Sequence, residues 1–196
     1  MTDEEKRIKS YLEAQGAKLS PAAIVDKVRA AMADLETAAL AVPAARFSER
    51  PDPDEWSANE VMAHVLAAGA HFSGGITASL DGAPPPPRMT DQGAVGAPVR
   101  SAAEWSGLLS RDREVLFDRV LRADPLANLE RPIEHGMFGP LNWREALLFM
   151  RLHDLDHAGQ LQKIVDATIA TKDQDKMRFN GTLKQFIYRL NARAQQ

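Results

Sequence analysis

The chain has 196 residues, a formal net charge of -3 at pH 7 and no cysteine. Its length suits one domain, or one domain with a small appendage. The lack of cysteine excludes disulfides, thiolate metal ligands and a cysteine nucleophile, so thiol chemistry would need a thiol from outside the chain. Without a basic tract, the sequence does not favour nucleic acid as a partner. It also has no apolar signal core and no apolar run of membrane-spanning length, so we expect a cytoplasmic protein with no membrane partner.

The N-terminus is predicted to form a helical arm over residues 1–18. Thr2 and Glu5 have the spacing of a capping box, and Gly16 is a typical signal for the end of a helix near Gln15. The arm has only a narrow apolar stripe, so we expect it to lie on the surface of the main body.

Four longer helices follow, and each begins at a residue that commonly caps a helix. They are predicted from Ser20 to about Ala41, from Ser57 to about Leu80, from Ser101 to about Ala123 and from Asn142 to about Thr168. A last short helix, from Asp173 or Asn180 to Arg193, is expected to pack on them over residues 171–196. Strand signals are absent. The sequence therefore predicts an all-α fold: a four-helix bundle over residues 19–170 with long crossover loops, flanked by the N-terminal arm and the short C-terminal helix.

The connection from Asp81 to Arg100 contains four consecutive prolines and is longer than an ordinary turn. Connections of this length often serve as lids or binding loops, and a plain crossover between two helices fits equally well. Both interpretations stay open from the sequence.

His153 and His157 lie four residues apart on the most apolar helix of the chain. Four residues turn a helix through about 400°, so the two imidazoles overlap on one face, about 6 Å apart along the axis. This spacing is common in metal sites and also on solvated helices without a metal. The apolar surroundings favour a metal site, because buried imidazole nitrogens need partners. Gln160 is expected to line the site or to donate a hydrogen bond there, whereas Asp154 and Asp156 point away and at most support the ligands from outside.

A third imidazole, His64, lies on the core-facing edge of the helix that begins at Ser57. A single histidine in such a place is more often a satisfied core residue than a metal ligand. Facing edges of neighbouring helices are nevertheless where bundles build their metal sites. Glu60, one turn before His64, is expected to cap its helix rather than bind a metal. We predict that His64, His153 and His157 hold one divalent metal ion.

Two further histidines are less clearly placed. His71 is about 10 Å along the helix from His64 and is expected to be a core or interface residue. His135 lies in a loop with Phe138. If the two helices that carry the metal ligands run parallel, this loop and Trp56 crowd one end of the bundle and overhang the metal, although a loop packed by its own aromatic residue fits equally well. His135 is then the one spare histidine placed for proton transfer, and we predict it as a catalytic residue.

These features resemble the DinB/YfiT-like superfamily. The resemblance covers about Ser20 to Thr168 and rests on Trp56-Ser-Ala-Asn-Glu-Val-Met-Ala-His64, Phe138-Gly-Pro-Leu and His153-Asp-Leu-Asp-His157-Ala-Gly-Gln160-Leu. It implies a four-helix bundle in which His64, His153 and His157 hold Zn, Ni, Fe or a similar ion. Members with known chemistry include thiol-dependent S-transferases and a mycothiol-dependent maleylpyruvate isomerase, and some members are dimers.

Three neutral imidazoles leave a bound ion with open positions, where it can activate water or an external low-molecular-weight thiol toward a small-molecule substrate that the sequence does not identify. On this interpretation the chain is a thiol-dependent S-transferase or a metal-dependent hydrolase, and a homodimer fits the resemblance. Two non-enzymatic interpretations stay open. One is a structural or sensing bundle that a metal braces, or that has no metal; the other is a dimeric scaffold that acts through partner contact.

Overall fold

The computed structural model describes residues 1–87 and 96–193, and the side chains of its last helix up to Thr168. Within these residues the chain forms five α-helices and one two-stranded sheet. The helices are α1 (Asp3–Lys18), α2 (Pro21–Ala41), α3 (Ala58–Leu80), α4 (Ala102–Leu121) and α5 (Trp143–Arg193), with a 3-10 turn at Ala44–Arg46. The predicted all-α class is confirmed. In the described part of the chain, no helix combines the length and the apolar character needed to cross a membrane.

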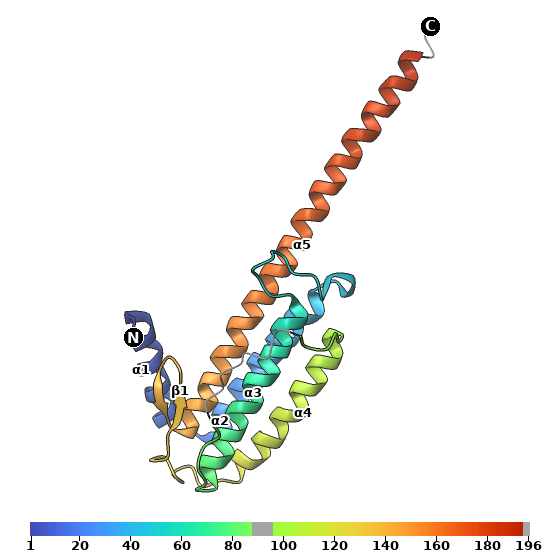
Figure 1. Cartoon of the computed structure of the whole chain (residues 1–196). Helices are drawn as coiled ribbons and strands as arrows, with labels where there is room; N and C mark the ends of the chain where they lie inside the picture. Colours follow the sequence, from blue (N-terminus) through green and yellow to red (C-terminus); the bar gives the residue numbers. More distant parts are fainter. Residues whose placement is uncertain (88–95, 194–196) are drawn as a thin grey trace.

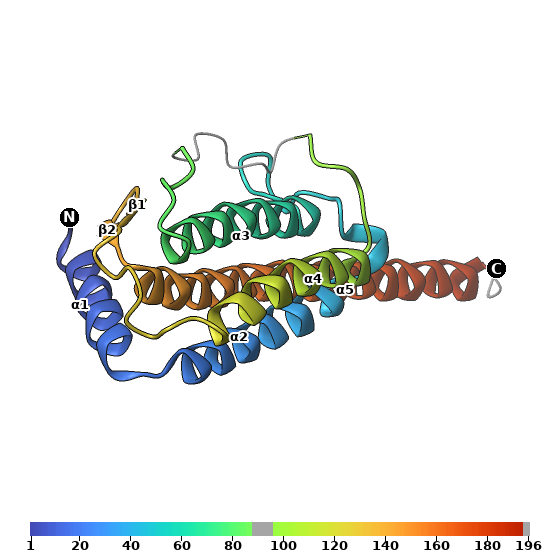
Figure 2. The same cartoon turned by 90° about the horizontal axis from the view of Figure 1, so that it is seen from below.

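Helices α2 to α5 form the bundle (Figures 1 and 2). Helices α2 and α3 each pack against both α4 and α5, which closes the four into a ring. Helix α3 runs antiparallel to α5, because His64 lies beside His153 whereas Phe72, two turns later, lies beside the earlier residue Phe149. The parallel arrangement considered from the sequence is therefore wrong. The loops that precede α3 and α5 enter at opposite ends of the bundle.

The predicted helix starts are confirmed by their caps. At α3, the Ser57 hydroxyl accepts a hydrogen bond from the Glu60 amide at 3.2 Å, and the Glu60 carboxylate accepts one from the Ser57 amide at 2.9 Å. The same reciprocal pair occurs at α1 and α4. At α5, Asn142 exchanges hydrogen bonds with Glu145 in the same way. These contacts satisfy amide groups that the first helical turn leaves without partners.

The core consists of two apolar clusters, one toward each end of the bundle. On α5 the buried members of the first cluster lie between Trp143 and Met150, and those of the second lie between Ala158 and Val165. His153 and His157 fall in the interval between them. The apolar packing on both sides thus holds this stretch of α5 against α3 without filling the space where the imidazoles lie.

Helix α5 continues without a break to Arg193. The predicted end near Thr168, followed by a separate helix packed on the bundle, is wrong: the last part of α5 extends beyond the other helices (Figure 1). The physical reason is that no proline interrupts α5, and its late glycine, Gly181, costs only about 1 kcal/mol relative to alanine. The apolar side chains expected on the last helix lie outside the described residues; they are Leu183, Phe186, Ile187 and Leu190.

Helix α1 packs across the start of α5, with Leu12 fully buried. Gly16 does not end this helix, which continues to Lys18. A Cβ at Gly16 would lie 3.1 Å from the Glu145 side chain, so the glycine permits a close approach of α1 to α5. The arm therefore belongs to the core at Leu12, although most of its other side chains face solvent.

A short hairpin, absent from the prediction, precedes α5. Strand β1 (Ile133–His135) pairs antiparallel with β2 (Gly139–Leu141). Each strand has only three residues, too few to show an alternating pattern in the sequence. Gly139 adopts a φ of 69°, a left-handed conformation that favours glycine. The Lys9 ammonium donates a hydrogen bond to the Phe138 carbonyl at 2.9 Å and ties α1 to the hairpin.

Candidate metal centre

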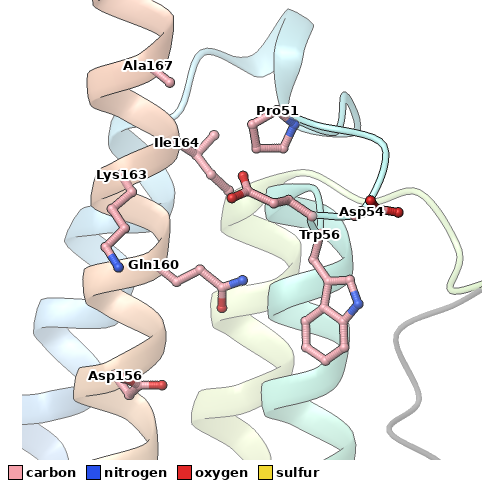
Figure 3. A pocket seen from close by; sticks show the side chains of 9 residues that line it. Pro51, Asp54, Trp56, Asp156, Gln160, Lys163, Ile164 and Ala167 are labelled. Atoms are coloured by element: carbon pink, nitrogen blue, oxygen red, sulfur yellow. The ribbon is translucent and has the colours of Figure 1, made fainter.

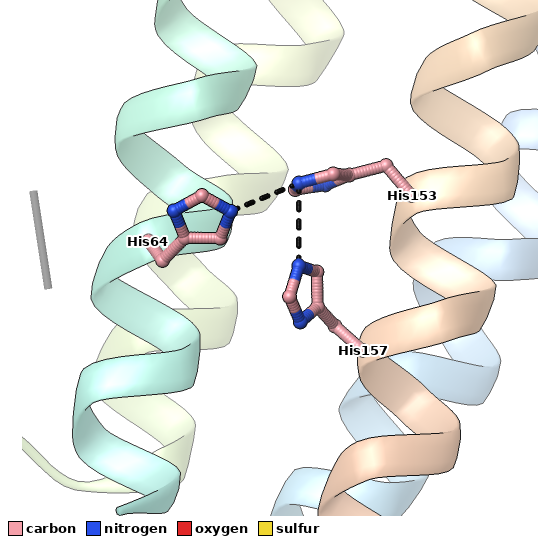
Figure 4. Close-up of side chains that lie close together, drawn as sticks. All are labelled: His64, His153 and His157. Carbon is pink, nitrogen blue, oxygen red and sulfur yellow. Dashed lines mark hydrogen bonds between the residues drawn. The ribbon is translucent and has the colours of Figure 1, made fainter. Parts of the chain in front are cut away.

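The three predicted metal ligands meet inside the bundle. His153 Nε2 lies 3.1 Å from His64 Nε2 and 3.2 Å from His157 Nε2 (Figure 4). One ring nitrogen from each residue lies within 4.8 Å of the other two. His64 and His157 are buried and His153 is half-buried. The helical spacing on α5 brings two of the rings together, and the antiparallel α3 supplies the third.

The spacing of these nitrogens fits a divalent ion. A tetrahedral ion with metal–nitrogen bonds near 2.0 Å separates its ligand nitrogens by about 3.3 Å. Hydrogen bonding alone satisfies the arrangement poorly, because a neutral His153 ring carries at most one proton on Nε2 and can donate to only one of its two neighbours. The second contact then has no proton directed along it. A cation bound by the three nitrogen atoms would satisfy both contacts.

The site favours the uncharged form of His153 and His157, the form in which an imidazole binds a metal. Burial, together with the neighbouring rings of His157 and His64, lowers the pKa of His153 to about 2. Burial also lowers the pKa of His157, against the opposing effect of its hydrogen bond to Gln160. Neutral rings present free lone pairs, so protons compete weakly with a metal here.

Gln160 and Trp56 orient two of the rings. Gln160 lies one turn after His157, and its Oε1 accepts a hydrogen bond from His157 Nδ1 at 2.8 Å. That bond places the His157 proton on Nδ1 and leaves the Nε2 lone pair facing the other histidines. The Trp56 ring packs against His64 with centroids 4.9 Å apart. Gln160 thus lies at the site as predicted, but it accepts a hydrogen bond there rather than donating one.

Asp154 and Asp156 have different surroundings, which the sequence did not distinguish. Asp154 is fully buried and accepts a hydrogen bond at 3.1 Å from Arg113, which is buried as well. Burial raises the pKa of Asp154 to about 6 despite the opposing effect of the Arg113 charge. Asp156 is exposed. Of the two predicted supporting carboxylates, Asp154 therefore anchors α5 to α4 directly behind the metal centre.

A cavity of about 550 Å³ opens onto the centre from the hairpin side. His64 and His153 form its inner end. Its walls and mouth are formed by the remaining lining residues: Ala68, His71 and Phe72 of α3, Phe149 of α5, Glu134, His135, Gly136 and Met137 of the hairpin, and Glu5 of α1. Phe149 was not singled out from the sequence, although it lies one turn before His153 and so shares its face. A small molecule in this cavity would reach the histidine nitrogens directly.

His135 lies in the wall of this cavity, and its ring is held in a fixed orientation. It stacks on Phe138 at 4.8 Å and meets the edge of Phe149 at 4.2 Å. Its Nδ1 accepts hydrogen bonds from the amides of Met137 and Phe138 at 3.1 and 3.2 Å. In a neutral ring the proton is therefore on Nε2. His71, expected in a core or interface, is half-buried and lines the same cavity.

A second cavity, of about 520 Å³, lies on the opposite side of the centre (Figure 3). Gln160 and Lys163 of α5 form one wall, and Trp56 with the preceding loop forms the other. No metal-site histidine lines it. It contacts the centre through Gln160 and Trp56, which support His157 and His64. The hairpin cavity is therefore the one with direct access to the imidazoles.

Comparison with known proteins agrees with this geometry. The model of the DinB superfamily matches residues 25–161, a range that contains all three histidines and Gln160. It leaves out α1 and the end of α5. No protein of curated function and no solved structure matches the chain. The fold, the buried histidine group and the extent of the match lead to one conclusion: the chain belongs to the DinB superfamily.

Proposed function

We propose that the protein is an enzyme in which His64, His153 and His157 hold one divalent metal ion. Zn, Ni and Fe are the candidate ions, because each accepts imidazole ligands. The convergence of three Nε2 atoms at 3.1 and 3.2 Å carries this proposal. Three histidines with no carboxylate among the ligands are typical of a site that keeps a position open for water or substrate.

When bound, such an ion acts as a Lewis acid and lowers the pKa of a water or thiol at its open position. The chain has no cysteine, so a thiol would come from a low-molecular-weight cosubstrate. The reaction classes that this chemistry supports are thiol-dependent S-transfer and hydrolysis.

The remaining residues of the site bind, orient and exchange protons. Gln160 holds His157 with its Nε2 lone pair toward the site. Phe72 and Phe149, whose rings lie 5.1 Å apart, exclude water from the inner end of the hairpin cavity. His135 exchanges a proton at Nε2, since its Nδ1 accepts two backbone amides. This role for His135 remains a prediction, as do a homodimer and a cytoplasmic location.

One observation favours a structural role for the metal. The three histidines join α3 to α5 in the interval between the two apolar clusters, where an ion would brace the bundle. A brace requires a closed ligand set, whereas the cavity of about 550 Å³ reaches His64 and His153. The open cavity favours the enzyme.

Cobalt substitution tests whether the bound metal is accessible to a thiol. We expect the visible absorption of the cobalt-loaded protein to change when cysteamine or a similar small thiol is added, because the ligand set of the ion changes. His64→Ala should abolish both cobalt binding and the response. A spectrum that is unaffected by thiol and by pH would indicate a closed, structural site and contradict the proposal.

A further inference from the structure

The hairpin cavity has aromatic walls around a space of about 550 Å³. Phe72 and Phe149 lie 5.1 Å apart, and the His135 ring lies 4.2 Å from Phe149. Met137, which is 54% exposed, contributes a flexible apolar side chain near the opening. Such walls favour a ligand with an apolar, ring-sized body, because that body removes aromatic surface from water on binding.

Charge is distributed unevenly over the same cavity. Its two carboxylates, Glu5 and Glu134, come from α1 and the hairpin, and no lysine or arginine is among the described lining residues. Glu5 is already engaged, since it accepts a hydrogen bond from the Thr2 amide at 2.6 Å and lies 3.8 Å from the α-amino group. Glu134 is exposed and has no ion pair with a described residue. Glu134 therefore makes the hairpin end of the cavity the more favourable place for a cationic group, and an anionic group would find no basic side chain among the described lining residues.

We propose that this cavity binds a small molecule with an apolar, ring-sized body and a protonated amine at the end that faces Glu134. Aromatic rings beside a carboxylate suit an ammonium group, because ring faces and carboxylate both attract the positive charge. The inner end of the ligand then lies against His64 and His153. Identifying this ligand with the substrate rests on the proposed function, whereas the preference for an amine rests only on the cavity.

Three matched probes test the preference: phenethylamine, phenethyl alcohol and hydrocinnamate, which differ mainly in the charge of the terminal group. Their affinities are measured by ligand-observed NMR on the full-length protein at about pH 8. The protein is metal-free, so that the carboxylate of hydrocinnamate cannot bind to a metal ion. We expect phenethylamine to bind most tightly and hydrocinnamate least tightly. The preference for the amine should weaken as salt is added, because the pair with Glu134 is exposed.

Variants separate the carboxylate from the walls. Glu134→Gln should weaken the binding of phenethylamine by about two- to fivefold, which is the range of an exposed ion pair, and leave the binding of phenethyl alcohol unchanged. Met137→Ala, at an exposed position that tolerates change, should weaken the binding of all three probes. Glu130→Gln is the matched control, because Glu130 is exposed four residues earlier and does not line the cavity, and it should change nothing.

The outcomes distinguish this proposal from the proposed function. Equal or tighter binding of hydrocinnamate to the metal-free protein would overturn the amine preference, as would a Glu134→Gln variant with unchanged phenethylamine affinity. If none of the probes binds, the cavity assignment is overturned, whatever the protein's affinity for zinc. If the probes bind in the expected order and the protein binds no metal, the cavity proposal stands and the enzymatic one fails.

Discussion

Arg113 of α4 and Asp154 of α5 form an ion pair in which both side chains are at most 1% exposed. Asp154 directly follows His153, so the pair fixes α5 against α4 at the level of the metal centre. Space for the guanidinium comes from Gly69 of α3, where a Cβ would lie 3.1 Å from Arg113 Nη2. Three helices therefore meet at one buried charged contact beside the histidines. Among the residues that the structure describes, Arg113 Nε and Nη1 and Asp154 Oδ2 have no hydrogen-bond partner, so the protein satisfies this contact incompletely.

Removing one member of this pair should destabilise the protein strongly. Asp154→Ala leaves the Arg113 charge buried without a partner, and we expect a loss of about 3–5 kcal/mol in the free energy of unfolding by urea denaturation. The double variant Arg113→Met/Asp154→Leu should recover most of that loss, because neither charge remains. Glu114→Gln, which breaks the exposed pair with Arg29, is the control and should cost at most about 1 kcal/mol. A double variant as unstable as Asp154→Ala would contradict this account.

Two glycine substitutions should have opposite effects. Gly69→Ala places a methyl group 3.1 to 3.3 Å from the buried Arg113 guanidinium, which has no room to move, and should lower the melting temperature. Gly159→Ala meets nothing within 4 Å on an exposed position of α5, and should stabilise the helix by about 0.5–1 kcal/mol. Thermal denaturation of the two variants compares them directly. Equal shifts in the melting temperatures of the two variants would mean that Gly69 does not make room for Arg113.

Gln160 should matter for metal affinity more than for folding. Gln160→Ala removes the acceptor that fixes the tautomer of His157, and losing such a partner typically weakens metal binding by about 10- to 100-fold. Gln162→Ala is the matched control, since among the described side chains Gln162 bonds only to the exposed Asp166. A chelator competition assay with zinc measures both variants. If the two variants bind zinc with similar affinity, Gln160 does not orient His157 for metal binding.

Glu60 should make stability depend on pH in the acid range. A hydrogen bond from Arg50, together with the cap at Ser57, lowers the pKa of Glu60 to about 2. The unfolded chain takes up this proton near pH 4.3, so the stabilisation is complete above that pH and is lost as the pH falls toward 2. Glu60→Gln should cost about 1–2 kcal/mol at pH 7 and progressively less below pH 4. Glu104→Gln, which removes a similar cap without a bonded arginine, should have a smaller effect. If the loss of unfolding free energy in Glu60→Gln does not change with pH, the charge of Glu60 is not the source of its stabilising effect.

The sequence predicts the parts of the fold that depend on neighbouring residues. Serine or asparagine followed three positions later by glutamate marks the starts of α3, α4 and α5, because each cap is closed within one helical turn. The pairing of His153 with His157 follows from helical spacing in the same way. What the sequence does not predict depends on contacts between distant residues.

Arg113 illustrates this limit. It lies in a charged stretch of α4 that suggests a solvated face, and only the fold reveals Asp154 and Gly69 beside it. The hairpin before α5 cannot be predicted from the sequence either, since its two strands are stabilised by pairing with each other and by Lys9 of α1. The direction of α3 relative to α5, which decides where Trp56 and His135 lie, also depends on the whole bundle rather than on either helix.

A zinc titration of the metal-free protein and of four single variants, with chelator competition to measure affinity, tests whether the three histidines hold one metal ion. We expect one ion per chain and a loss of at least about 100-fold in affinity for His64→Ala, His153→Ala and His157→Ala, because each variant removes one of three ligands. His71→Ala, on the same helix as His64 and in the wall of the same cavity, should bind zinc like the unaltered protein. A wild-type chain that binds no zinc, nickel or iron, or a His64→Ala variant that binds as tightly as His71→Ala, would contradict this expectation.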